Sequence, residues 1–122
     1  MGWEEKREYK RAYVKVAVEY RGKNFWQIVE AQDISAGGMF LSTDKIESND
    51  TKIEVMFTFG GNKKKFIHAE AVVVWGRPKV SKDENGNILP AGMGIKFTKF
   101  LPFRSKDLID EAIKEMEDEN NG

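Results

Sequence analysis

The alternation of apolar and polar side chains along the first half of the chain predicts β-strands. Residues 12–20 place apolar side chains at every second position, which is the two-residue period of a half-buried strand. The aromatic and β-branched segment 24–32 follows a glycine-containing turn at 21–23, so the two segments are expected to pair as a hairpin. A third, short strand is predicted at 39–42.

The second half of the chain continues the same pattern. Strands are predicted at 51–59 and 65–75, followed by an exposed and mobile excursion at 76–91, which contains two prolines and an Asn-Gly turn, and by a closing strand at 92–97. The positions expected to face inward in the two long strands are Ile53, Val55, Phe57 and Phe59 in the first, and Ile67, Ala69, Ala71, Val73 and Trp75 in the second.

A C-terminal amphipathic helix is predicted at 105–118. Pro102 ends the strand pattern, Ser105 can cap the helix, and one helical face carries Leu108, Ile109, Ala112, Ile113 and Met116. Short strands followed by one helix predict an all-β fold with a terminal helix. A small antiparallel barrel is favoured because closure removes exposed strand edges, and an open sheet is the alternative.

Composition limits the class of protein. The 122 residues fit one domain spanning 1–122, with enough apolar residues (40%) to form a core. The absence of cysteine excludes disulfides and thiolate metal sites. Twenty basic and twenty acidic residues cancel, so nothing indicates general binding to DNA, RNA or membrane surfaces. No apolar run reaches the roughly 20 residues of a membrane span, and the N-terminus has no apolar leader, so a cytoplasmic location is expected.

The chain also lacks the residues of common enzyme classes. His68 is the only histidine, which leaves no partners for a catalytic triad or a multi-histidine metal site, and no P-loop sequence occurs. We therefore expect no catalytic residues, no metal and no cofactor. Trp26, Phe66 and Trp75 are interpreted as aromatics of the fold, in the core or in hairpin pairs. A barrel that binds single-stranded RNA is a weaker hypothesis, because no aromatic-basic stripe is present.

Two short motifs carry candidate binding chemistry. Arg7 and Arg11 lie four residues apart just before the first strand, and guanidinium groups bind phosphate oxygens through paired hydrogen bonds and stack on purines. Taken alone, such a pair is also typical of a solvated surface.

The second motif is Asp33-Ile34-Ser35-Ala36-Gly37-Gly38, between the second and third strands. A carboxylate such as that of Asp33 can accept the N1-H and amino group of guanine, a serine hydroxyl can bond phosphate, and glycine lets backbone amides approach closely. The alternative interpretation is an ordinary turn, in which Asp33 or Ser35 caps backbone amides and the glycines supply positive φ.

Together the motifs resemble those of the PilZ family, R-x-x-x-R followed about twenty residues later by (D/N)-x-S-x-x-G. The resemblance covers roughly residues 5–116 and includes the late strand sequences at 72–75 and 94–97. It implies a six-stranded antiparallel barrel over 12–100, a flexible arginine-containing arm at 1–11 and the C-terminal helix. It also implies a non-enzymatic receptor that binds cyclic di-GMP and signals to an effector protein, still unknown. The alternative is a PilZ-like adaptor in motility or pilus assembly with weak or no nucleotide binding.

The resemblance assigns roles to single residues. Arg7 and Arg11 would contact phosphates and guanine faces, Asp33 would read a guanine edge, and Ser35 and Gly38 would shape the loop that faces the ligand. Lys6 adds a cation directly before Arg7, a position compatible with an intercalated pair of ligands, so two ligands per chain are expected.

Overall fold

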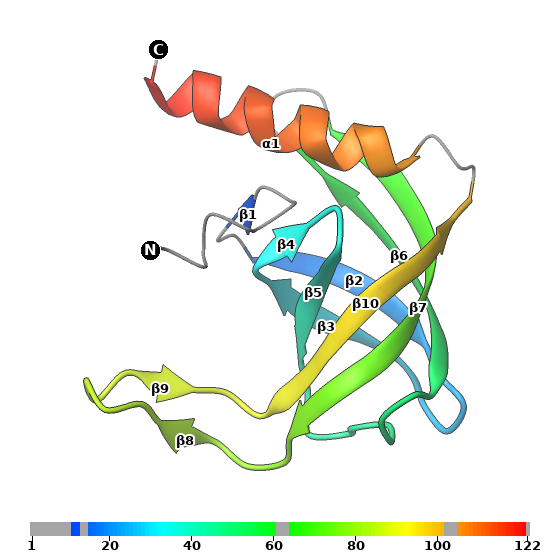
Figure 1. Ribbon diagram of the computed structural model, residues 1–122, viewed down its shortest axis with the longest axis vertical. Helices are drawn as coiled ribbons and strands as arrows, with labels where there is room; N and C mark the ends of the chain where they lie inside the picture. The colour runs from blue at the N-terminus through cyan, green and yellow to red at the C-terminus, as the bar shows by residue number, and fades with distance from the viewer. Residues whose placement is uncertain (1–10, 13–14, 61–63, 102–104, 122) are drawn as a thin grey trace, which may run out of the picture.

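The strands of the protein close into a single antiparallel barrel. The computed structural model describes residues 11–12, 15–60, 64–101 and 105–121. Six strands form the barrel in the order β10-β5-β3-β2-β6-β7 (Figure 1). Their bounds are β2 Val16–Arg21, β3 Trp26–Gln32, β5 Gly38–Ser42, β6 Lys52–Phe59, β7 Lys65–Arg77 and β10 Gly92–Phe100. The barrel confirms the expected architecture and removes the open sheet as an alternative.

The core fills the barrel with the side chains that alternate inward along each strand. All four predicted inward residues of β6 are buried, as are the first four of β7. Because inward and outward positions alternate in a strand, each barrel strand contributes every second side chain to one shared interior. The largest fully buried side chains are Tyr20, Phe59, Ile34, Leu41, Ile67, Met93, Ile109 and Ile113.

Helix α1 (Ser105–Asn121) covers one end of the barrel (Figure 1). Ile109, Ala112 and Ile113 are buried in the core, with Leu108 and Met116 partly buried against it, as the helical spacing predicts. A salt bridge of 3.8 Å between Lys65 and Glu115 joins β7 to the helix. The predicted helix cap by Ser105 stays a prediction, because the Ser105 side chain lies outside the described residues. No helix in the described ranges is long and apolar enough to cross a membrane.

The predicted strand at 12–20 is wrong as one element. Its start forms β1 (Arg11–Ala12), which pairs not with the barrel but with β4 (Ile34–Ser35), and β2 begins only at Val16. Val14, one of the alternating apolar positions of the predicted strand, lies outside the described residues. Strand β4 was not predicted, because two residues cannot display a period.

The segment 76–91 is largely exposed, as predicted, but it contains a hairpin of β8 (Ser81–Lys82) and β9 (Ile88–Leu89). The Asp83 carboxylate accepts hydrogen bonds from the backbone N-H of Asn85 and Asn87 and from the Asn87 side chain. These bonds, the Asn87 side-chain bond first, lower the pKa of Asp83. The hairpin turn is therefore fixed by its own polar groups.

The end of the barrel away from α1 is held by a buried carboxylate. Glu47, on the segment between β5 and β6, is only 3% exposed. It accepts hydrogen bonds from the Tyr20 hydroxyl (2.7 Å), the Asn24 backbone N-H (3.0 Å) and the Asn24 side-chain amide (2.9 Å). Burial acts to raise the pKa of Glu47, but the hydrogen bonds from Asn24 and Tyr20 outweigh it and lower the pKa below the ordinary value of 4.5. The carboxylate thus joins the β2–β3 turn to the β5–β6 connection.

Replacing Glu47 by glutamine should lower the free energy of unfolding at pH 7 by about 1–3 kcal/mol, because buried donors lose their charged acceptor. Since the folded-state pKa is depressed, this contribution is complete above pH 4.5 and is lost as the pH falls through the lower folded value. Urea unfolding at neutral pH and at about pH 3 should therefore give a smaller difference in acid. Glu30→Gln, which alters an exposed carboxylate on β3, is the control and should show no such dependence.

Candidate ligand-binding site

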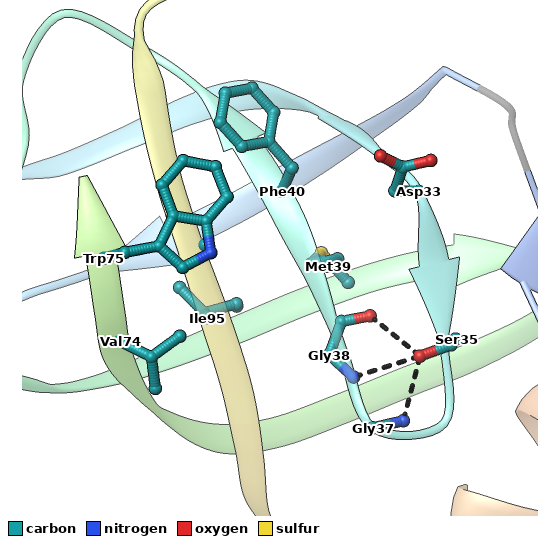
Figure 2. A pocket seen from close by; sticks show the side chains of 10 residues that line it. Asp33, Ser35, Gly37, Gly38, Met39, Phe40, Val74, Trp75 and Ile95 are labelled. Atoms are coloured by element: carbon teal, nitrogen blue, oxygen red, sulfur yellow. Dashed lines mark hydrogen bonds between the residues drawn. The ribbon is translucent and has the colours of Figure 1, made fainter. Parts of the chain in front are cut away.

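A depression of about 270 Å³ lies on the outer surface of the barrel, between the β4–β5 turn and the end of β7. Asp33 and Trp75 lie on opposite sides of it (Figure 2). The lining residues are Asp33, Ser35, Gly37, Gly38, Met39, Phe40, Val74, Trp75, Gly94 and Ile95. Three of the six predicted ligand-binding residues, Asp33, Ser35 and Gly38, therefore meet in one depression.

Three adjacent strands build an aromatic pair at this depression. Gly94 of β10 is the register partner of Phe40 on β5 and of Trp75 on β7. A Cβ at Gly94 would overlap the indole of Trp75, so only glycine lets the ring lie across the strand. Phe40 and Trp75 stack above it with centroids 5.5 Å apart and planes 23° apart. We call Phe40 and Trp75 the aromatic pair.

The prediction that Trp75 faces inward is wrong, and a β-bulge explains why. Gly94 pairs with Trp75 and Ile95 with Val73, so Val74 is an extra residue without a partner on β10. An extra residue reverses the alternation beyond it, and Trp75 is turned to the outer surface with 42% of its area exposed. Trp26 and Phe66 are exposed rather than in the core, and they lie in hairpin pairs, Trp26 opposite Arg21 and Phe66 opposite Thr58.

Neither Phe40 nor Trp75 was expected to face a ligand. A usable signal was the spacing of Gly92 and Gly94 in β10, because two glycines at alternate positions leave one face of a strand without side chains. An aromatic side chain of a neighbouring strand commonly covers such a face.

Asp33 presents a carboxylate for which the described residues supply no partner. Its backbone is left-handed, with φ of 54°, which is uncommon for a residue other than glycine but tolerated by aspartate. Among the described residues no hydrogen bond or ion pair to its carboxylate is found, and the capping considered for Asp33 or Ser35 is made by Ser35. Its half-buried position at the rim leaves the carboxylate available to a ligand.

Ser35 instead holds the turn together. It is 6% exposed, and its Oγ accepts hydrogen bonds from the N-H of Gly37 (3.1 Å) and Gly38 (3.3 Å) and donates to the Gly38 carbonyl (3.4 Å) (Figure 2). Gly38 is needed for close approach and not for positive φ, because a Cβ there would strike the Ile95 carbonyl of β10. Both residues shape the loop, and the Ser35 hydroxyl is already occupied.

The pairing of β1 with β4 joins the two motifs. Arg11 is the register partner of Ser35, and Ala12 that of Ile34. The backbone of the second motif arginine therefore lies directly opposite the serine of the other motif. The predicted positions Lys6 and Arg7, and the flexibility expected for 1–11, lie outside the described residues apart from the Arg11 backbone.

A larger depression, of about 520 Å³, is found elsewhere on β6, β7 and β10. Its charged lining residues have both signs, Lys52 and Lys99 against Glu54 and Glu70, and it contains no predicted site residue. We therefore take the smaller depression as the candidate site, because residue chemistry decides more than volume.

Comparison with known proteins identifies the family. The family model described as PilZ domain matches residues 5–115, so the chain belongs to the PilZ family. The solved structure of the Bacillus subtilis inhibitor of motility MotI/DgrA superposes with a TM-score of 0.68 at 16% identity. The match covers 92% of this chain and 52% of that one, so the chain spans about half the length of MotI/DgrA and shares its fold. No curated protein sequence matches significantly.

Replacing Gly94 by alanine should displace the Trp75 indole and separate the aromatic pair. The free energy of unfolding should fall by about 0.5–1.5 kcal/mol, the value of an aromatic contact. Near-ultraviolet circular dichroism would report the loss of the stacked arrangement. Gly76→Ala is the control, because a Cβ there meets only Ile46 at 3.0 Å and a carbonyl at 3.8 Å. Equal spectral changes in both variants would contradict the role of Gly94.

Proposed function

We propose that the protein is a receptor that binds cyclic di-GMP at the candidate site and performs no chemistry on it. The observation that carries this proposal is the Asp33 carboxylate, unpaired among the described residues, across the depression from Trp75 (Figure 2). A purine can stack on the exposed indole, and guanine offers the carboxylate two parallel donors, N1-H and the exocyclic amine. Adenine has no such pair of donors, so the arrangement favours guanine.

The volume and charge of the depression indicate that it would hold only part of the ligand. About 270 Å³ is below the usual range of ligand pockets, roughly 300–1,000 Å³. It suits one base, and the remainder of a dinucleotide would lie outside. Among the described residues, those that line the depression include a carboxylate but no lysine or arginine. The phosphates therefore need cations from elsewhere in the chain.

The motif arginines are the proposed source of these cations. The β1–β4 pairing supports this role for Arg11, because its backbone is directly opposite Ser35. Arg7 and Lys6 precede it in sequence and would add charge from the same side. Ordering such a polar arm costs conformational entropy, which phosphate contacts would offset. Ligand binding would then order the segment 1–11.

The output of such a receptor requires a second molecule. We propose that the liganded domain acts in the cytoplasm on an effector protein.

Titration with cyclic di-GMP, GTP and a linear guanine dinucleotide would test the proposed ligand binding by calorimetry. Preference for the cyclic dinucleotide is expected. Equal weak responses to all three would refute it and favour the adaptor without nucleotide binding.

Replacing Asp33 by alanine should weaken cyclic di-GMP binding by about 1–3 kcal/mol, the value of a paired base-edge contact. The ratio of affinities for cyclic di-GMP and cyclic di-AMP should fall as well. Asp50→Ala is the matched control, since Asp50 is the other aspartate with positive φ, 70°, and lies outside the depression. Asp50→Ala likewise puts alanine at a position of positive φ, and it should keep the wild-type affinity for cyclic di-GMP. A wild-type ratio in Asp33→Ala would show that another group reads the base.

Replacing Lys6 by leucine should reduce the ligand stoichiometry from about two towards one. A stacked pair of ligands concentrates four phosphate charges, and each fixed cation reduces their mutual repulsion. Calorimetry at low and high salt would measure both the stoichiometry and the salt dependence, which should be stronger in the wild type. A stoichiometry of one in both proteins would remove Lys6 from the site.

A further inference from the structure

Arg77 lies behind the aromatic pair and contacts both of its rings. The guanidinium carbon is 5.2 Å from the centroid of Trp75 and 5.5 Å from that of Phe40. It reaches both because its register partner is Gly92, which presents no side chain. Arg77 is half-buried and is not among the residues that line the depression. Its connection to the depression is therefore through the two rings.

The same guanidinium makes a second connection. Its Nη1 donates a hydrogen bond of 2.9 Å to the carbonyl of Pro90, the residue that follows β9. A planar guanidinium can stack on rings and donate in its own plane at the same time, which an ammonium group cannot. One side chain thus links the aromatic pair to the base of the β8–β9 hairpin.

The hairpin is well suited to respond to this link. β8 and β9 form a separate two-stranded sheet that projects from the barrel (Figure 1). A two-stranded hairpin is marginally stable on its own, so its orientation depends on contacts at its base. Those contacts include the Arg77 bond and one from the Thr43 N-H to the Ala91 carbonyl, 3.1 Å. The hairpin also exposes two apolar side chains, Val80 (65%) and Ile88 (68%).

We propose that Arg77 is a positioning residue that fixes the aromatic pair and couples it to the β8–β9 hairpin. A ligand base that stacks on Trp75 changes the contact between the indole and the guanidinium, and the change reaches the hairpin through Pro90. The hairpin is then the part of the surface whose orientation reports occupancy of the site. This inference rests on the proposed function for its ligand-dependent step, whereas the contacts of Arg77 exist without a ligand.

Arg77→Met tests the contacts in the ligand-free protein, because methionine keeps apolar bulk but has neither charge nor donor. Nuclear magnetic resonance would follow the Trp75 indole N-H, assigned with Trp75→Phe, and the methyl groups of Val80 and Ile88. All three signals should shift. Arg21→Met is the matched control, since the Arg21 guanidinium lies 5.2 Å from the centroid of Trp26, which is not among the residues lining the depression. It should shift the Trp26 indole signal alone. Unchanged Trp75 and hairpin signals in Arg77→Met would overturn the inference.

The second arm of the experiment adds cyclic di-GMP. In the wild type the Val80 and Ile88 methyl signals should shift on binding. Arg77→Met should weaken affinity about threefold to tenfold, as expected for the loss of cation–π contacts, and should reduce the methyl shift. Arg77→Lys should restore only part of the affinity and part of the methyl shift. Full restoration of either would contradict the role of the guanidinium plane. Binding to the wild type without a hairpin shift would overturn the coupling. Absence of binding to the wild type would refute the proposed function, whereas the ligand-free spectra would still decide whether Arg77 holds the pair.

Discussion

The candidate site depends on one missing side chain. Gly94 separates Phe40 from Trp75 in a row across three strands, and only without a Cβ there can the indole lie flat against β10. The bulge at Val74 is equally necessary, because the regular alternation of β7 would bury Trp75 in the core. The barrel therefore places a large aromatic surface on its outside, across the depression from Asp33. Neither feature adds a chemical group, yet together they create the wall of the depression.

The two polar motif residues between β3 and β5 have different roles. Ser35 stabilises the loop, and Asp33 lies at the rim of the depression. The buried Ser35 hydroxyl accepts hydrogen bonds from the amides of Gly37 and Gly38, whereas Asp33, with its left-handed backbone, has no carboxylate partner among the described residues. If Asp33 capped these amides, its carboxylate would be occupied. Because Ser35 caps the amides, the Asp33 carboxylate is not used by the described part of the loop. This division gives a physical reason for an acidic residue and a serine two positions apart in such a loop.

Local periodicity predicted most elements of the fold, and short motifs predicted part of the candidate site. The inward faces of β6 and of most of β7, and the buried face of α1, follow from spacing alone. Trp75 was misplaced because a bulge is a property of the pairing between β7 and β10, which no single strand encodes. Strands β1 and β4 escaped detection because two residues have no period. Asp33, Ser35 and Gly38 were selected by motif, but their division of roles required the hydrogen bonds of the folded loop.

The charges near the depression are arranged so that the barrel alone is poorly suited to an anion. The lining residues in the described part of the chain include a carboxylate and no cation, and the guanidinium of Arg77 contacts two rings and donates to a carbonyl. A phosphate at the depression would meet the Asp33 carboxylate, with no lysine or arginine among the described lining residues. In the proposed receptor, base recognition therefore belongs to the barrel, and charge neutralisation belongs to the segment before β2. Because each part is insufficient by itself, binding must bring them together. A receptor built in this way couples recognition of the base to the ordering of its own arm.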